Sequence, residues 1–142
     1  MYTSVTDRQK CRALRYLAAA ILVAAAGGVY EYFSHGVRSN YMIFTFMVPL
    51  LAGAAPNLLA ALAGNKKRAS GGSPAAAALQ LAAVATLTTG SLMNGALGIY
   101  GTTNRLMTVY PVEGLALLTA ALAAYVLQDR RLSAAPSEQG RI

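Results

Sequence analysis

The sequence predicts an all-α integral membrane protein, a bundle of four transmembrane helices with both termini in the cytoplasm. Three observations support this prediction. Hydrophobic residues make up 56% and charged residues 12% of the 142-residue chain, whereas a typical soluble domain has about 25% charged residues. The apolar residues fall into four segments, each close to the roughly 20 residues that a membrane-spanning helix needs. The basic residues flank these segments unevenly.

The four predicted spans follow one another with short connections. They cover approximately residues 13–33, 41–63, 74–100 and 109–128. Residues 1–12 form a basic N-terminal segment, and residues 129–142 form a tail with the composition of a disordered end. The connection at residues 64–73 combines Gly, Ser, Asn and basic residues, which is typical of a flexible loop. No segment is left over for a soluble domain.

The basic residues predict the orientation of the spans. Ten of the twelve lysines and arginines lie before span one or in its first turn, between spans two and three, or after span four, whereas Arg38 and Arg105 lie in the other two loops. Cytoplasmic loops carry the excess of Lys and Arg, so we expect a plasma-membrane protein with both termini inside. This distribution accounts for the net charge of +7. We therefore expect contact with anionic membrane lipids and no nucleic-acid partner.

An alternative is that the first span is a cleaved signal peptide. A basic segment precedes the apolar residues 17–26, and three alanines at 24–26 fit a cleavage site. We favour an uncleaved helix because the apolar stretch continues to Tyr30 and because cleavage leaves an odd number of spans. Cys11 precedes the apolar stretch and is interpreted as a reduced cytoplasmic thiol. A single cysteine excludes a disulfide framework and a cysteine-based zinc site within one chain.

Polar and aromatic residues collect at the predicted outer ends of the spans. Five of the eight tyrosines lie there: Tyr30, Tyr32, Tyr41, Tyr100 and Tyr110. The cytoplasmic halves consist almost entirely of Ala, Leu and Val. An aromatic belt explains interfacial tyrosines, but a belt should occupy both membrane faces, and on the inner face Tyr16 and Tyr125 alone hold comparable positions. The excess on the outer side predicts a specialised outer mouth.

Glu31 is the residue whose position most needs an explanation. It lies in the last turn of the first span, where the negative end of the helix dipole disfavours a carboxylate. It can pair with Arg38 or Arg105, be hydrated at the interface, or form an ion or proton site. His35, four residues later, shares its helix face if the helix continues. One Glu and one His fall short of the three or four ligands that zinc needs, so we expect no metal and no other cofactor.

Glu113 and Asn94 each have a structural and a functional interpretation. Glu113 follows Pro111 in the first turn of span four, where an acidic side chain complements the helix dipole. Asn94 belongs to a stripe of small and polar residues on one face of span three: Thr86, Gly90, Asn94, Gly98 and Gly101. Such a stripe usually serves close packing and hydrogen bonding between helices. If the stripe lines a cavity instead, Asn94 is the natural ligand contact.

Pro49 and Pro56 both lie inside the second span, and each removes a backbone hydrogen bond. The carbonyl groups freed in this way must be satisfied by side chains, water or an ion. Interrupted helices often mark the binding site in transporters. We therefore predict that the two prolines break the helix and gate a transport path.

These features favour the binding or transport of a small solute or lipid through an outward-facing polar and aromatic vestibule. The predicted ligand-binding residues are Glu31, His35, Arg38, Asn94, Tyr100, Arg105 and Glu113. Four short spans enclose little volume, so a homo-oligomer or a partner membrane protein is expected. The alternative is a non-catalytic accessory subunit of a larger membrane complex.

A lesser alternative is an intramembrane enzyme that uses Glu31 and His35 as acid and base. No nucleophile accompanies this pair, and the chain contains no Walker, nucleophile-elbow or zinc-protease motif. An enzyme is therefore not the favoured class.

Overall fold

The structure is a computed structural model that describes residues 5–35, 37–62 and 74–134. Within these residues the protein is all-helical. Its elements are α1 (Val5–Phe33), α2 (Asn40–Phe44), the π-helix η1 (Pro49–Ala54), α3 (Ala55–Leu62), α5 (Pro74–Ile99), the 3₁₀-helix η2 (Arg105–Thr108) and α6 (Val109–Ala134). They form four segments that are long and apolar enough to cross a membrane, at residues 8–33, 40–62, 74–99 and 105–128. The predicted fold class is confirmed to this extent.

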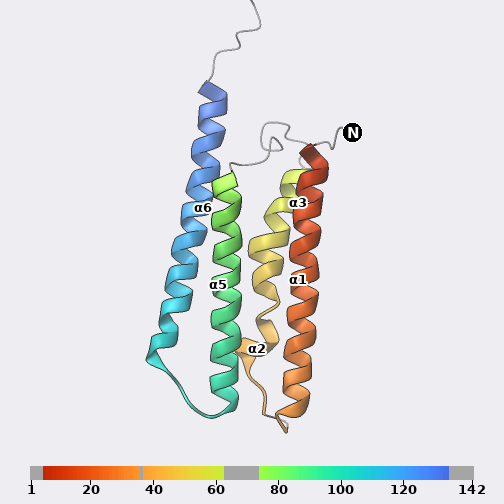
Figure 1. The fold of residues 1–142 in the computed structure, drawn as a ribbon, viewed down its shortest axis with the longest axis vertical. Helices are drawn as coiled ribbons and strands as arrows, with labels where there is room; N and C mark the ends of the chain where they lie inside the picture. The colour runs from red at the N-terminus through yellow and green to blue at the C-terminus, as the bar shows by residue number, and fades with distance from the viewer. Residues whose placement is uncertain (1–4, 36, 63–73, 135–142) are drawn as a thin grey trace, which may run out of the picture.

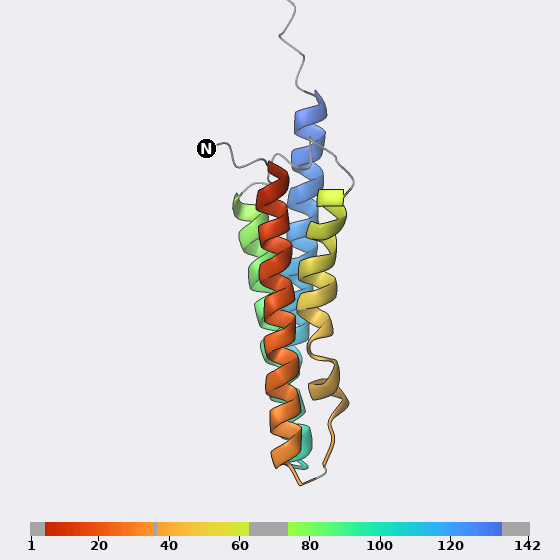
Figure 2. The same cartoon turned by 90° about the vertical axis from the view of Figure 1, so that its right-hand side faces the viewer.

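The four spans stand side by side in chain order, as a staggered row (Figures 1 and 2). α1 packs on η1 and α3, while α5 packs on α2 and η1 on one side and on α6 on the other. Among the described residues, α1 and α6 make no extensive contact with each other. We call the end where α1 begins and α6 ends the terminal end. The opposite end, with the α1–α2 and α5–α6 connections, is the hairpin end (Figure 1).

The position of each span in the row decides how much of it is covered. We compare the most apolar 18-residue stretch of each span. In this stretch, 33% of the residues of the second span and 28% of those of α5 are buried within the protein. The corresponding values for α1 and α6 are 17% and 11%. The two edge helices therefore leave most of their apolar surface to lipid or to a partner.

α1 and α6 extend beyond the apolar spans at the terminal end. α1 begins at Val5, so the basic segment before the span is helical from that residue onward, and α6 continues to Ala134. Neither extension contains Gly or Pro, the residues that most strongly oppose a helix. The part of the expected tail between residues 129 and 134 is therefore helical. Residues 135–142 and the basic loop predicted at 64–73 lie outside the described residues.

Glycines permit the closest approaches between neighbouring helices. A Cβ on Gly27 of α1 would lie 3.3 Å from the Met42 carbonyl oxygen, and a Cβ on Gly95 of α5 would lie 3.1 Å from the Met42 nitrogen. The short helix α2 thus sits against both α1 and α5. Gly90 of α5 lies directly against Tyr110 of α6, with no room for a Cβ between them. At Gly90, the small-residue stripe of α5 serves close helix packing.

We expect Gly90→Ala to destabilise the protein by roughly 1–3 kcal/mol, because the added methyl group must push α6 away from α5. Gly28 is the matched control, since a Cβ at this position of α1 meets nothing within 4 Å. Gly28→Ala should leave the stability unchanged or raise it slightly, because Ala favours a helix more than Gly does. Reversible unfolding in mixed micelles measures both variants. Equal stability of the two variants would contradict this account of the α5–α6 contact.

Candidate functional site

The second span is interrupted where its two prolines lie. The α-helix α2 ends at Phe44, and Pro49 begins the π-helix η1, which continues to Ala54. Pro56 follows as the second residue of α3. Short π-helical stretches within helices are frequent at functional sites. Here Pro49 begins the irregular segment and Pro56 lies just after its end, while their role as a gate stays a prediction.

The carbonyl group that Pro56 frees is satisfied by a side chain from another span. Proline has no N–H, so the Ala52 carbonyl cannot receive the usual α-helical hydrogen bond from residue 56. Gln80 of α5 is buried and donates from Nε2 to this carbonyl oxygen over 2.9 Å. The Oε1 atom of Gln80 accepts from Nδ2 of the buried Asn57 at 3.4 Å. The interruption of span two therefore supplies the acceptor to which α5 is attached.

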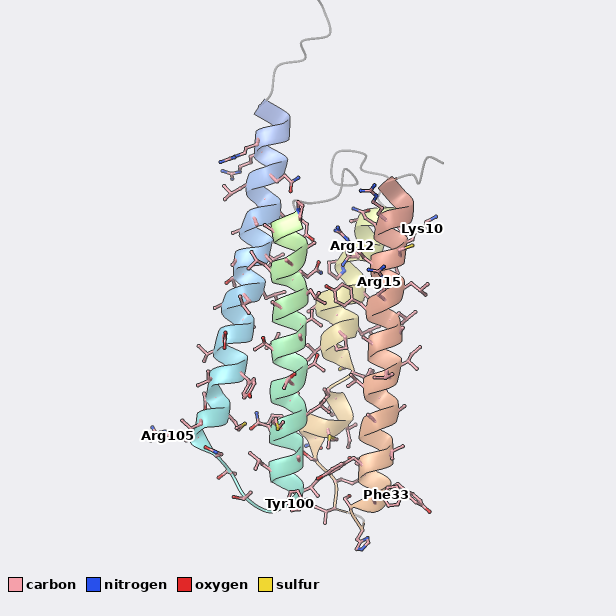
Figure 3. All side chains as sticks on the ribbon, viewed as in Figure 1. Lys10, Arg12, Arg15, Phe33, Tyr100 and Arg105 are labelled. Atoms are coloured by element: carbon pink, nitrogen blue, oxygen red, sulfur yellow. The ribbon has the colours of Figure 1, made fainter. Side chains whose placement is uncertain are left out.

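Side chains from the two edge helices complete this polar cluster. Tyr125 of α6 donates its hydroxyl to Gln80 Oε1 at 3.2 Å. The ring of Tyr16 of α1 lies directly on Gly53 and leaves no room for a Cβ there. Arg12 interacts electrostatically with both tyrosines, and Figure 3 shows its side chain turned toward the interior of the row. We call Tyr16, Asn57, Gln80 and Tyr125 the Gln80 cluster; it draws on all four spans.

The Gln80 cluster was not predicted from the sequence, because the predicted cytoplasmic halves of the spans consist almost entirely of Ala, Leu and Val. The available signal was the pair of amide side chains, Asn57 and Gln80, placed singly in apolar stretches. Pro56 lies next to Asn57, so a donor for the freed carbonyl was to be expected nearby. The amide groups of the cluster hydrogen-bond within it, which favours a structural role.

A shallow, open depression with a volume of about 380 Å³ lies at the hairpin end, between α1 and α5. Its lining residues are Tyr30, Phe33, Ser34, His35, Ile99 and Tyr100. The Tyr30 side chain hydrogen-bonds to that of Tyr100, so the two helix ends are joined across the depression. Figure 3 shows Phe33 at this end of α1 and Tyr100 at this end of α5. The depression is thus mainly aromatic, with a hydroxyl and an imidazole in its wall.

His35 reaches the depression because α1 ends before it. The helix stops at Phe33, and His35 adopts a left-handed backbone conformation with φ 56°. The Ser34 hydroxyl lies 2.8 Å from the Glu31 carbonyl oxygen and 2.7 Å from the Val37 carbonyl oxygen and can donate its proton to either one, which holds the turn together. Because the helix ends before His35, Glu31 and His35 do not share a helix face.

Of the predicted ligand-binding residues, His35 and Tyr100 line the depression. Asn94 instead donates from Nδ2 to the carbonyl oxygen of Gly90 on its own helix, over 3.0 Å. The remaining residues outside α1 and α5 are exposed: Arg38, Arg105 and Glu113. Figure 3 shows Arg105 beside α6, at the edge of the row far from α1. The structure therefore does not gather the predicted set into one vestibule.

Glu31 lies in α1 next to the depression but is not part of its lining. Its Oε1 atom is buried and has no hydrogen-bond partner among the described residues. Neither Arg38 nor Arg105 donates to this oxygen, although both were candidates for an ion pair with Glu31. One oxygen of the Glu31 carboxyl group is thus buried and accepts no hydrogen bond from the described residues.

In the described segments, no group of three or more His, Cys, Asp or Glu residues is placed to hold a metal ion. No protein-family model, curated protein or solved structure matches this chain. The function is therefore inferred from the geometry of the depression and from the distribution of charge.

The hydrogen bond from Gln80 to the Ala52 carbonyl is tested by a double-mutant cycle. We expect Gln80→Leu to destabilise the protein by about 1–2 kcal/mol, in the upper range for hydrogen bonds between membrane helices. In a Pro56→Ala background the cost should be smaller, because the introduced alanine has a backbone N–H that can bond to the Ala52 carbonyl. Unfolding of the four proteins in mixed micelles gives the coupling energy. An identical cost of Gln80→Leu in both backgrounds would show that the contribution of this bond does not depend on the missing N–H of Pro56.

Proposed function

We propose that the protein resides in the plasma membrane and binds a small solute or lipid in the depression at the hairpin end. One observation carries the proposal: two spans that are not adjacent in the chain, α1 and α5, contribute rings and polar groups to the same concave surface. Ligand sites are typically concave and mostly apolar, with a few polar groups that orient the ligand. Ser34 and His35 supply such groups here.

The interrupted second span supports an extension of this proposal to transport. α2 contacts α1 at Gly27 and α5 at Gly95, the two helices that form the depression. A movement of α2 about the break before Pro49 therefore changes the spacing of the walls. In this proposal Pro49 and Pro56 are the gate, and binding between α1 and α5 is the step that the gate controls.

The proposed orientation has the hairpin end outside the cell. Ten of the twelve basic residues lie at or before the start of span one (up to Arg15), follow span four, or belong to the loop between spans two and three. All three of these regions belong to the terminal end if the spans alternate in direction. The positive-inside rule then assigns this end to the cytoplasm, and the depression faces the outer solution.

The second candidate function is a non-catalytic accessory subunit of a larger membrane complex. It is favoured by the exposed edges of the row, because 11% of the residues in the apolar stretch of α6 are buried within the protein. An edge helix of this kind can be covered by another membrane protein as readily as by lipid.

Tyr100→Ala should abolish ligand binding, because it removes one wall of the depression and the hydrogen bond to Tyr30. Tyr41→Ala is the control, since Tyr41 is an exposed tyrosine of α2 at the same end and is not among the lining residues. Native mass spectrometry after gentle solubilisation should show the same small-molecule or lipid adduct on the wild type and on Tyr41→Ala, and none on Tyr100→Ala. A wild type that is bare, or bound to an unrelated protein, would instead favour the accessory subunit.

The orientation is tested by cysteine labelling in intact cells. Cys11 is exposed near the terminal end, and His35 is exposed at the hairpin end. A membrane-impermeant maleimide should label His35→Cys in a Cys11→Ser background without permeabilisation. Native Cys11 should react after permeabilisation alone. The opposite pattern would reverse the proposed topology.

A further inference from the structure

We propose that the ligand of the depression is a lipophilic organic cation and that Glu31 is its counter-charge. This inference rests on the proposed function, because it names the chemical class of the ligand for the same site. Three features lead to it: the aromatic lining, the unused carboxylate oxygen beside it, and the absence of lysine and arginine from the lining.

The aromatic lining provides the surface on which a cation binds. Tyr30, Phe33 and Tyr100 contribute three rings from two helices. A cation within about 6 Å of a ring centre is attracted by the negative face of the ring, and the attraction grows as the site loses water. Phe33 also makes an edge-to-face contact with Tyr32, with ring centroids 5.5 Å apart. A volume of about 380 Å³ suits an organic molecule rather than a single inorganic ion.

Glu31 supplies the negative charge. It lies on α1 between the lining residues Tyr30 and Ser34, and Ser34 is hydrogen-bonded to its carbonyl oxygen at 2.8 Å. The Oε1 atom is buried without a hydrogen-bond partner in the described chain. Leaving a buried carboxylate oxygen without a hydrogen-bond partner is unfavourable. A cation in the adjacent depression offsets this cost, since water screens the attraction less there than in bulk solution.

The remaining charges at the hairpin end do not favour an anion. Arg38 and Arg105 are its basic residues, and both are exposed. Glu31 and Glu113 balance them in number, so the lysines, arginines and carboxylates of the hairpin end give it no net positive charge. His35 is the lining residue that can carry a positive charge. In its neutral form its ring offers a further aromatic face to a cation.

The test uses two probe ions of almost the same shape and opposite charge, tetraphenylphosphonium and tetraphenylborate. Binding of each to the full-length protein is measured in a neutral detergent. We expect the phosphonium to bind the wild type at least roughly tenfold more tightly than the borate. Glu31→Gln should weaken phosphonium binding by about tenfold or more, because it removes the counter-charge while keeping the shape of the side chain.

Glu113→Gln is the matched control, since Glu113 is an exposed carboxylate of α6 outside the depression. It should change phosphonium binding by less than about twofold, because water screens an exposed charge. Glu31→Asp keeps the charge and should keep most of the preference for the phosphonium. Thermal unfolding of every variant separates a loss of binding from a loss of the folded protein.

Equal binding of the two ions, with both weakened by Tyr100→Ala, would overturn the cation inference and leave the proposed binding site intact. Failure of the wild type to bind the phosphonium would also overturn it, and the adduct experiment with Tyr100→Ala then decides separately whether the depression binds any ligand. Equal effects of Glu31→Gln and Glu113→Gln on phosphonium binding would show that Glu31 is not the counter-charge.

A competition experiment distinguishes the two sources of the cation. If phosphatidylcholine displaces the bound phosphonium, the natural cation is a lipid head group; if it does not, the natural cation is a free solute.

Discussion

The missing N–H of Pro56 is the constraint on which the packing of the four spans depends. A carbonyl group without a partner is costly inside a membrane-spanning segment, because no water is present to bond to it. Gln80 satisfies the freed carbonyl of Ala52, and the oxygen of Gln80 in turn attracts Asn57 and Tyr125. One glutamine side chain therefore links the interrupted part of span two to α5 and, through its oxygen, to Tyr125 of α6.

The two ends of the row differ because span two is regular at one end and interrupted at the other. At the terminal end, α3 is a continuous helix and the Gln80 cluster connects it to its neighbours. At the hairpin end, the short helix α2 lies between Gly27 of α1 and Gly95 of α5. The depression occupies the space next to it, where Tyr30 and Tyr100 meet. Tight polar packing at one end thus accompanies an open aromatic surface at the other.

Much of the fold was predictable because membrane thickness limits the length of each apolar helix; α5, for example, begins at Pro74 as expected. The arrangement in a row was not predictable, because the spans are apolar on all sides and, apart from the small-residue stripe of α5, carry no periodic signal for the faces that meet. The aromatic excess at one end identified His35 and Tyr100. It could not show that Asn94 bonds to its own helix, nor that Gln80 lies opposite the carbonyl freed by Pro56, since both depend on helix rotation.

The pairing of each span with its neighbours in the chain has a consequence for biogenesis. α1 can pack against α3 as soon as both have been synthesised, and the later spans can be added one at a time, because no extensive contact between α1 and α6 has to form. Such local connectivity favours assembly during synthesis. The Ala52 carbonyl is the exception. It is synthesised with the second span, but its hydrogen bond from Gln80 can form after α5 has been synthesised. Until then, the half-made protein carries a polar group that a lipid, a water molecule or the insertion machinery must accommodate.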